Sequence, residues 1–217
     1  MKILVVGSET EFKEFKEKFG ETNELEHTTS RGIHDFQEFD AVFDFKMGDN
    51  PEEFDIYAEE EGLNVFINAP KISLAELAFY QPELHCNLYG FNGLPTFVNR
   101  DILEISSYKD DEGLKLLCDQ LNTDYEIVKD RVGMVTPRII FMIINEAFYT
   151  VQEGTATKED IDQGMKLGTN YPFGPFEWLE KIGIQNVYET LEAIYEDTKE
   201  ERYKICPLLK REYLLAN

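Results

Sequence analysis

The sequence predicts an α/β fold, in which a shortened Rossmann-like parallel-sheet domain precedes an all-α domain. A continuous apolar run at residues 3–7, ILVVG, is typical of a buried parallel strand. Further apolar runs alternate with helix-like segments, an order that favours a parallel sheet covered by helices. After about residue 128 the strand patterns stop and helical periodicity remains. We therefore expect a Rossmann-like domain at residues 1–128 and a helical domain at residues 129–217.

The apolar pattern of the first domain places its strands and helices. In the segment EFKEFKEKFG, the side chains of Phe12, Phe15 and Phe19 share one face at helical spacing, so we expect an amphipathic helix. The expected strands lie at residues 3–7, 40–45, 64–68, 84–91 and 102–105, and the expected helices at residues 11–20, 51–61, 73–79 and 110–121.

In the second domain, residues 138–154 are apolar nearly all round, which predicts a buried central helix or a dimer contact. Gly154 suits the left-handed position after that helix. Thr157, with an acidic residue three positions later, has the capping-box spacing that opens a helix, and Gly168 is expected to end it. Gly174-Pro175 begins another helix. The expected helices after the first lie at residues 157–167, 175–182 and 186–202.

Composition narrows the classes of function. The formal net charge of −22 repels nucleic-acid phosphates, so we expect no nucleic-acid partner and a protein that is soluble in the cytoplasm. No apolar run approaches the roughly 20 residues that span a bilayer, and the N-terminal run is too short for a signal peptide, so no membrane partner is expected. Three widely spaced cysteines argue against a disulfide framework and a metal site: Cys86, Cys118 and Cys206.

The run from Asn145 to Gly183, NEAFYTVQEGTATKEDIDQGMKLGTNYPFGPFEWLEKIG, resembles the C-terminal domain of the 3-hydroxyacyl-CoA dehydrogenases. In that family an EGxAxxxDID…xxGxxxPxGPFEWLDxxG-like run is characteristic, and 3-hydroxybutyryl-CoA dehydrogenases have this plan. The resemblance covers the first half of the chain more weakly. It implies a place in acyl-CoA metabolism, NAD as cofactor, an acyl-CoA-type ligand and a homodimer through the helical domain. Residues 28–40 lack the helical hairpin that contacts CoA in relatives.

The cofactor loop departs from the dinucleotide pattern. A dinucleotide site needs GxGxxG after the first strand, so that the backbone can approach the pyrophosphate and the helix can pack closely. Gly7 and Ser8 begin the loop here, but Glu9 and Phe12 occupy the second and third glycine positions. A carboxylate where the pyrophosphate would sit adds like-charge repulsion. This loop predicts a degenerate NAD-binding domain.

Two further positions correspond to residues that face the cofactor in relatives. Asp44 holds the place of an acidic residue after a strand, and Asn68 resembles an asparagine near the nicotinamide. Both are also ordinary strand-end residues, which often cap turns.

The catalytic positions are altered as well. In relatives a histidine acts as general base and a glutamate twelve residues later orients it. Glu104 matches that glutamate, and Asn92 stands in the place of the histidine. An amide cannot accept and release a proton near neutral pH, so the base is missing. Two supporting positions hold Pro70 and Pro137, and for His85 a structural role is favoured over that of an alternative base.

The residues leave three hypotheses open. The first is a catalytically impaired or inactive homologue that acts as a binding or dimerisation module. The second is an active NAD-dependent oxidoreductase of 3-hydroxyacyl-CoA with unusual active-site residues. The third is a subunit that pairs with an intact relative through the helical domain. A basic pocket that includes Arg131, Arg138 or Lys166 would favour a CoA ligand on so acidic a protein.

Overall fold

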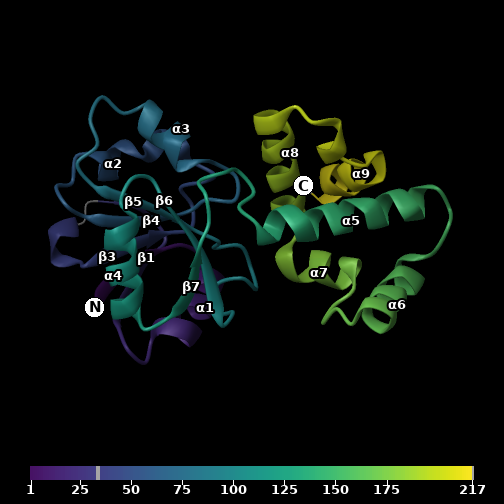
Figure 1. The fold of residues 1–217 in the computed structure, drawn as a ribbon, viewed down its shortest axis with the longest axis horizontal. Helices are drawn as coiled ribbons and strands as arrows, with labels where there is room; N and C mark the ends of the chain where they lie inside the picture. The colour runs from purple at the N-terminus through teal and green to yellow at the C-terminus, as the bar shows by residue number, and fades with distance from the viewer. Residues whose placement is uncertain (33–34, 217) are drawn as a thin grey trace. The chain divides into compact units, whose positions relative to one another are not determined.

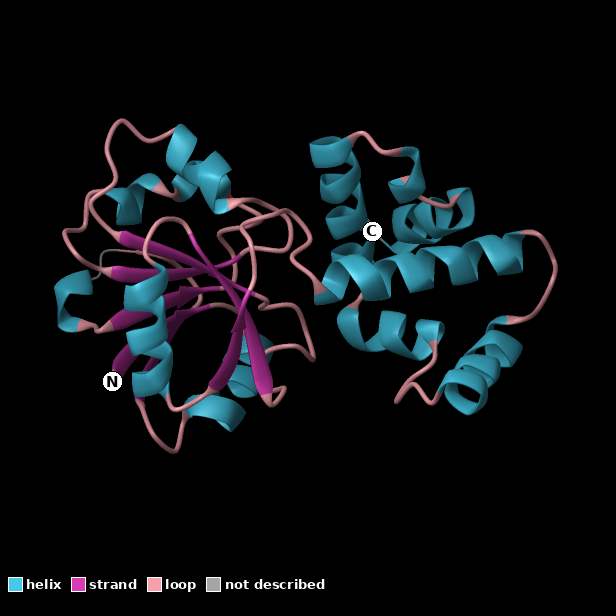
Figure 2. Ribbon diagram, in the orientation of Figure 1, coloured by secondary structure: helices cyan, strands magenta, loops and turns pink. Residues whose placement is uncertain are grey.

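The structure is a computed structural model that describes residues 1–32 and 35–216. These residues divide into two compact units, Met1–Met134 and a second unit that begins at Val135. The sequence analysis places the domain boundary slightly earlier, between residues 128 and 129. The first unit holds a sheet with helices, and the second is built from helices, which confirms the predicted fold class (Figures 1 and 2).

A seven-stranded sheet forms the first unit, in the order β2-β1-β3-β4-β5-β6-β7. Neighbouring strands are parallel except β5 and β6, which pair in the antiparallel sense. This pair departs from the parallel sheet that the sequence predicts, because residues 92–101 form turns and no helical crossover. The strands are β1 (Lys2–Val6), β2 (Glu24–Thr28), β3 (Ala41–Asp44), β4 (Asn64–Asn68), β5 (Asn87–Phe91), β6 (Ile102–Ser107) and β7 (Asp124–Ile127).

Neither edge strand of the sheet is predicted by the sequence. β2 has the sequence ELEHT and β7 the sequence DYEI, with an acidic side chain at alternate positions and only partial burial. Each lies at one edge of the sheet and pairs with a single neighbour. An edge strand can keep polar side chains in water, so its apolar pattern is too weak to predict.

Successive strand residues point to opposite faces of the sheet, so each face carries buried apolar side chains. Helices cover both faces. On one face, Phe15 and Phe19 of α1 (Glu9–Phe19) pack with Val5 and Phe43. Leu114 of α4 (Asp111–Leu121) belongs to the same cluster. The predicted helices in these two segments are confirmed.

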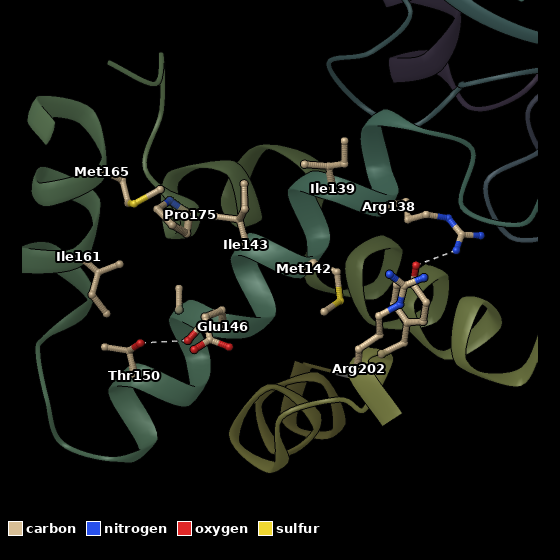
Figure 3. A pocket seen from close by; sticks show the side chains of 12 residues that line it. Arg138, Ile139, Met142, Ile143, Glu146, Thr150, Ile161, Met165, Pro175 and Arg202 are labelled. Atoms are coloured by element: carbon tan, nitrogen blue, oxygen red, sulfur yellow. Dashed lines mark hydrogen bonds between the residues drawn. The ribbon is translucent and has the colours of Figure 1, made fainter. Parts of the chain in front are cut away.

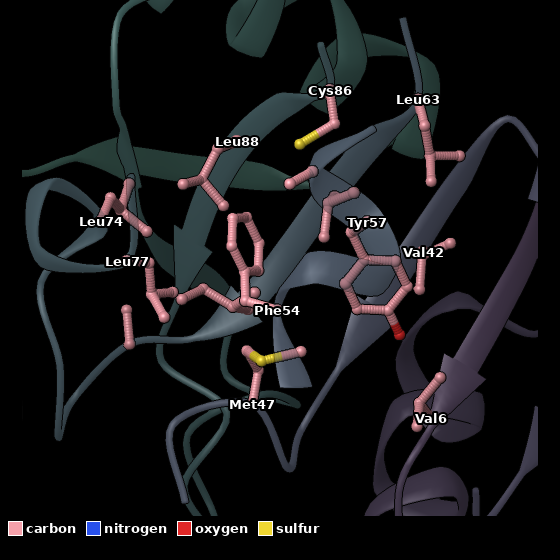
Figure 4. Packing of buried hydrophobic residues seen from close by; sticks show 14 of the residues in the cluster. Val6, Val42, Met47, Phe54, Tyr57, Leu63, Leu74, Leu77, Cys86 and Leu88 are labelled. Carbon is pink, nitrogen blue, oxygen red and sulfur yellow. The ribbon is translucent and has the colours of Figure 1, made fainter. Parts of the chain in front are cut away.

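The other face is covered by short helices. Phe54 and Tyr57 pack there with Val42 of the sheet (Figure 4). The helix predicted at residues 51–61 is divided into two shorter segments, and the chain turns at Gly62, whose φ of 70° cannot continue a helix. The segments on this face are η1 (Phe36–Glu38), η2 (Pro51–Glu53), α2 (Asp55–Ala58) and α3 (Leu74–Phe79).

In the second unit, α5 (Thr136–Gln152) is the central helix and contacts the other four helices. This confirms the central helix that the apolar run predicts. Within residues 1–32 and 35–216, no helix combines the length and the apolar character needed to cross a membrane. The remaining segments are α6 (Lys158–Thr169), α7 (Pro175–Ile182), α8 (Ile184–Thr198), η3 (Glu201–Tyr203) and α9 (Pro207–Ala216).

Helix α9 is not among the predicted helices, and its position depends on residues distant in the sequence. Asn145 of α5 donates from Nδ2 to the carbonyl oxygen of Lys204 at 3.0 Å and accepts from the N–H of Cys206 at 2.8 Å. Gln152, two turns further along, accepts from the N–H of Leu208 at 3.0 Å. Side chains of α5 therefore hydrogen-bond the backbone at the start of α9. No local sequence pattern predicts these bonds.

Turn chemistry explains the start and end of α6. Gly154 follows α5 with a positive φ of 73°, as predicted. Thr157 accepts from the N–H of Asp160 at 3.1 Å and so begins α6, also as predicted. The expected end at Gly168 is wrong, because the helix continues to Thr169 and the left-handed residue is Asn170, with φ 57°. Asparagine tolerates this conformation better than most residues.

The Gly174-Pro175 step begins α7, as predicted, with a cap supplied from a distance. Asp162 of α6 accepts from the N–H groups of Phe176 and Glu177, at 2.8 and 3.2 Å. A Cβ at position 174 would lie 2.3 Å from Asp162 Oδ1. Glycine at 174 lets this carboxylate approach the helix end.

Candidate functional site

The predicted site residues lie at one end of the sheet, where the parallel strands have their carboxyl ends. The register places Val6 of β1 beside Asp44 of β3, and Asn68 of β4 beside Phe91 of β5. Glu104 lies on antiparallel β6, next to the residue that pairs with Phe91. Open α/β sheets bind ligands at this edge. The other predicted residues there are Gly7, Ser8 and Asn92, which directly follow β1 and β5.

The loop after β1 is capped by a side chain of α1, the helix that follows it. The N–H of Ser8 donates to Glu11 Oε2 at 2.6 Å, and the N–H of Glu11 donates to Ser8 Oγ at 3.3 Å. Gly7 leaves room for this carboxylate, since a Cβ there would lie 2.9 Å from Glu11 Oε2. A helix N-terminus attracts an anion, and here the anion is part of the protein. Glu11 is not among the predicted site residues, although SETE has the capping-box spacing that could have indicated it.

Neighbouring side chains fill the rest of this loop region. The ring of Phe12 stacks on His27, with centroids 4.4 Å apart and an angle of 6° between the rings. His27 Nε2 lies 3.0 Å from the carbonyl oxygen of Gly7, and its Nδ1 lies 3.6 Å from the carboxylate of Glu9. The second strand ends at Thr28, where dinucleotide-binding folds carry an acidic residue for the ribose.

Asp44 is fully buried in an ion-pair network. Arg31, 7% exposed, donates to its two oxygens at 2.6 and 3.2 Å. The hydroxyl of Tyr57 donates at 2.9 Å and the N–H of Lys46 at 2.8 Å. Burial opposes the charge of Arg31, but Asp44 outweighs it and raises the pKa of the guanidinium, while burial and Asp44 together raise the pKa of Tyr57. These bonds use both carboxylate oxygens of Asp44 inside the protein.

Arg31 also pairs with the partly exposed carboxylate of Glu53. The arginine lies in the short segment 28–40, where the sequence analysis notes only a missing hairpin. No local pattern marks it, because its partners follow 13 and 22 residues later.

Asn68 joins two loops at the same edge. Its Nδ2 donates to the carbonyl oxygen of Phe45 at 3.4 Å, and its Oδ1 accepts from the N–H of Gly93 at 2.9 Å. The amide of Asn68 therefore joins the backbone after β3 to the backbone beside Asn92.

Asn92 and Glu104 form a buried pair, 2% and 9% exposed. Asn92 Nδ2 donates to Glu104 Oε2 at 3.4 Å, and the backbone N–H of Asn92 donates to the carbonyl oxygen of Glu104 at 3.0 Å. Asn92 Oδ1 has no hydrogen-bond donor among the residues that the structure describes. The pair can orient a group by hydrogen bonding, but its amide cannot take up a proton.

His85 lies at the other end of β5, before its first residue, and contacts the carboxylates of Glu61 and Glu83. This position separates it from Asn92 by the length of the strand. Within the described ranges, no three His, Cys, Asp or Glu side chains come together in a way that would hold a metal ion.

A cavity of about 840 Å³ opens in the helical unit, between α5, α6 and η3 (Figure 3). Arg138 lines it and donates to the hydroxyl of Tyr203 at 2.9 Å. Ile139 at its rim is 57% exposed. Lys166, the other basic candidate of this unit, pairs with Glu177. The remaining lining is mostly apolar and includes Met142, Ile143, Ile161, Met165 and Pro175.

Comparison with known proteins gives a consistent result. The family model "3-hydroxyacyl-CoA dehydrogenase, C-terminal domain" matches residues 133–215. The 3-hydroxyadipyl-CoA dehydrogenase of Escherichia coli is 43% identical over 90 residues, which are 42% of this chain and 19% of that protein. A probable 3-hydroxybutyryl-CoA dehydrogenase of Bacillus subtilis is 28% identical over 148 residues, 66% of this chain and 52% of that protein. The matched parts thus span about half or less of these two relatives.

Among solved structures, the (S)-3-hydroxybutyryl-CoA dehydrogenase of Ralstonia eutropha has the same fold. It aligns with a TM-score of 0.73 over 99% of this chain and 94% of that chain, at 20% sequence identity. The likeness in fold therefore extends over both units, whereas the family model covers the helical one.

Proposed function

We propose that the chain belongs to the 3-hydroxyacyl-CoA dehydrogenase family, whose C-terminal domain model matches residues 133–215, and that it binds an acyl-CoA-type ligand without transferring hydride. It would act as a binding or dimerisation module in acyl-CoA metabolism. Its net charge of −22 and its three buried free cysteines support a reducing, cytoplasmic location.

One observation carries this proposal. The side chain that hydrogen-bonds Glu104 is an amide, Asn92, where the reaction needs a group that takes the proton of the hydroxyl. An amide offers an acceptor oxygen but does not become protonated near neutral pH. Glu104 alone therefore has no base to orient.

The cofactor loop supports the same conclusion. NAD is the cofactor expected from the family, but the residues of the loop do not fit a dinucleotide. The backbone N–H of Ser8, which a phosphate would use, already donates to Glu11, and Asp44 is committed to Arg31. A pyrophosphate would also meet the negative charges of Glu9 and Glu11.

An activity assay separates this proposal from an active oxidoreductase. The full chain is mixed with acetoacetyl-CoA and NADH, and the absorbance of NADH is followed. We expect no turnover above background, and turnover that Glu104→Gln abolishes would establish the alternative. Glu24→Gln, at an exposed position of β2, is the control for loss of a carboxylate.

Restoring the base tests the role of the loop. Asn92→His would place an imidazole beside Glu104, yet we expect no turnover, because the closed loop still opposes the cofactor. Calorimetric titration of wild type should show heat for an acyl-CoA and none for NADH. Turnover in Asn92→His would mean that NADH binds and that only the base is missing.

The helical unit supports a homodimer. The open apolar cavity with Ile139 at its rim gives a second copy a surface to bury. Light scattering after size exclusion should give twice the chain mass for wild type and the single mass for Ile139→Glu. Leu116→Glu, at an equally exposed leucine of α4, should stay dimeric. A monomeric wild type would favour pairing with an intact relative instead.

A further inference from the structure

Two neighbouring aromatic side chains at the end of α3, Phe79 and Tyr80, are exposed to solvent. They are 79% and 73% exposed, and their rings meet edge to face with centroids 5.3 Å apart. Earlier in the same helix, Leu74 and Leu77 face the core in the cluster that contains Phe54 (Figure 4). Single exposed apolar residues are common, but adjacent exposed aromatic residues are typical of a surface that another molecule covers.

Two hollows adjoin Tyr80, which lines both of them. The first has a volume of about 370 Å³ and lies between η2, α2 and α3, with Pro51, Ile72 and Leu77 as its apolar lining. The second has a volume of about 570 Å³ and extends to His85. Ile72 and Leu77 are buried, so they form the floor of the first hollow, and the ring of Tyr80 forms a wall. An apolar side chain of a partner can therefore enter beside an aromatic ring.

Carboxylates surround both hollows. None of the lining residues, all of which the structure describes, is a lysine or an arginine. The imidazole of His85 lies 3.3 Å from the carboxylate of Glu61 and 3.6 Å from that of Glu83. The surface is therefore negative and complements a cationic partner. The acidic residues that line the hollows are Glu52, Asp55, Glu59, Glu76 and Glu83.

We propose that this acidic-aromatic surface, formed by Phe79, Tyr80 and the two hollows, binds a basic segment of a partner protein. A large apolar side chain of the segment fills the hollow above Ile72 and Leu77. Lysine or arginine side chains beside it lie against the exposed aromatic rings and pair with the surrounding carboxylates. The apolar hollow and the negative charge together select a segment that is both apolar and basic.

The same charges argue against other occupants. A second copy that bound through this surface would bring identical carboxylates together, and the net charge of −22 adds repulsion. Nucleic acids and anionic lipid headgroups are repelled as well. His85 precedes the first residue of β5, so this surface lies at the opposite end of the sheet from the predicted site residues. The proposal goes beyond acyl-CoA binding and does not depend on it.

Fluorescence anisotropy of the full chain with three labelled peptides tests the proposal. The first is an amphipathic peptide of leucine and lysine, the second has serine in place of leucine, and the third has glutamate in place of lysine. We expect the leucine–lysine peptide to bind at least about tenfold more tightly than the serine–lysine peptide, and the leucine–glutamate peptide not to bind. Added salt should weaken the binding. This comparison uses the wild-type chain alone.

A double variant tests the aromatic pair. Phe79→Ala/Tyr80→Ala removes two exposed rings, so the fold should be kept while the leucine–lysine peptide binds at least about tenfold more weakly. Leu116→Ala, at an exposed leucine of α4, is the matched control and should bind the peptide as wild type does.

A second double variant tests the carboxylates. Glu52→Gln/Glu76→Gln removes two charges beside the first hollow and should weaken the same peptide about threefold. Glu21→Gln/Glu24→Gln removes equal charge from exposed positions elsewhere in the α/β unit and should have a smaller effect.

Four results would each overturn the proposal. The first is no binding of the leucine–lysine peptide, and the second is equal binding of the two lysine peptides, which would show attraction to the net charge alone. The third is unchanged binding by Phe79→Ala/Tyr80→Ala, which would place the peptide elsewhere. The fourth is a dimeric wild type that this double variant makes monomeric in light scattering, which would mean that a second copy covers the surface.

Discussion

Two equally buried asparagines, one in each unit, have opposite hydrogen-bond environments. Asn145 and Asn92 are both 2% exposed. Asn145 uses both ends of its amide, with bonds of 3.0 and 2.8 Å to the backbone before α9. Asn92 uses one end, at 3.4 Å, and its Oδ1 has no donor among the residues that the structure describes. A buried amide whose partners lie in the surrounding backbone completes the fold, whereas equal burial does not by itself supply those partners.

The largest effect is expected where a buried polar group of the α/β unit is fully paired. Asp44→Ala leaves the guanidinium of Arg31 buried without its main partner and should lower the free energy of unfolding by about 3–5 kcal/mol. Chemical denaturation measures this loss. Glu53→Gln removes the partly exposed partner of the same arginine and should cost less than about 1 kcal/mol. Equal losses would mean that Asp44 is not the central partner.

Asn145→Ala should cost about 2–3 kcal/mol, because the N–H of Cys206 loses its acceptor and the carbonyl oxygen of Lys204 keeps only the 3.5 Å bond from the Tyr149 hydroxyl. The measurement is again the midpoint and slope of chemical denaturation. Asn186→Ala in α8, which loses a single bond of 2.9 Å to Ile182, is the matched control and should cost about 1 kcal/mol. A loss for Asn145→Ala no larger than that for Asn186→Ala would contradict the claim that both ends of the Asn145 amide stabilise the fold.

Asn92→Leu should change the free energy of unfolding by less than about 1 kcal/mol. The substitution removes one long hydrogen bond but also removes an acceptor that is buried without a partner, and these effects oppose each other. Thermal denaturation without ligand measures the change. A loss comparable to that of Asn145→Ala would show that Oδ1 is satisfied in the folded protein.

The smallest effect is a gain. Burial raises the pKa of Glu14, although hydrogen bonds from the backbone N–H groups of Thr96, Asn99 and Val98 partly offset this effect. A raised folded-state pKa means that the stability contribution is present below the unfolded pKa and is lost as pH rises through the folded pKa. Glu14→Gln should therefore stabilise the chain at pH 8 by less than about 1 kcal/mol, since water screens this half-buried group.

Below the ordinary glutamate pKa of 4.5, the gain from Glu14→Gln should vanish, because the carboxyl is then neutral in both states. Denaturation curves at pH 8 and near pH 4 measure the difference. Glu21→Gln, at an exposed site beyond α1, should show no such pH dependence. A loss of stability at pH 8 would contradict the sign.

The sequence by itself determined the central strands, the long helices and the turns at Gly154, Thr157 and Gly174-Pro175. It also carried the resemblance to the C-terminal domain of the 3-hydroxyacyl-CoA dehydrogenases in the run from Asn145 to Gly183, and it marked Asn92 and Glu104 as a pair. Periodicity and capping act over a few residues, so they can be read directly from the chain.

Tertiary structure decided the rest, because the remaining features depend on residues far apart in the chain. The edge strands β2 and β7 exist through pairing with a neighbour, and the antiparallel β6 follows from the path of its connection. The partner of Asp44, Arg31, is 13 residues away, and that of Asn145, Cys206, is 61 residues away. Whether a buried amide is satisfied depends on which distant donors the fold brings to it, and for Asn92 Oδ1 the described chain brings none.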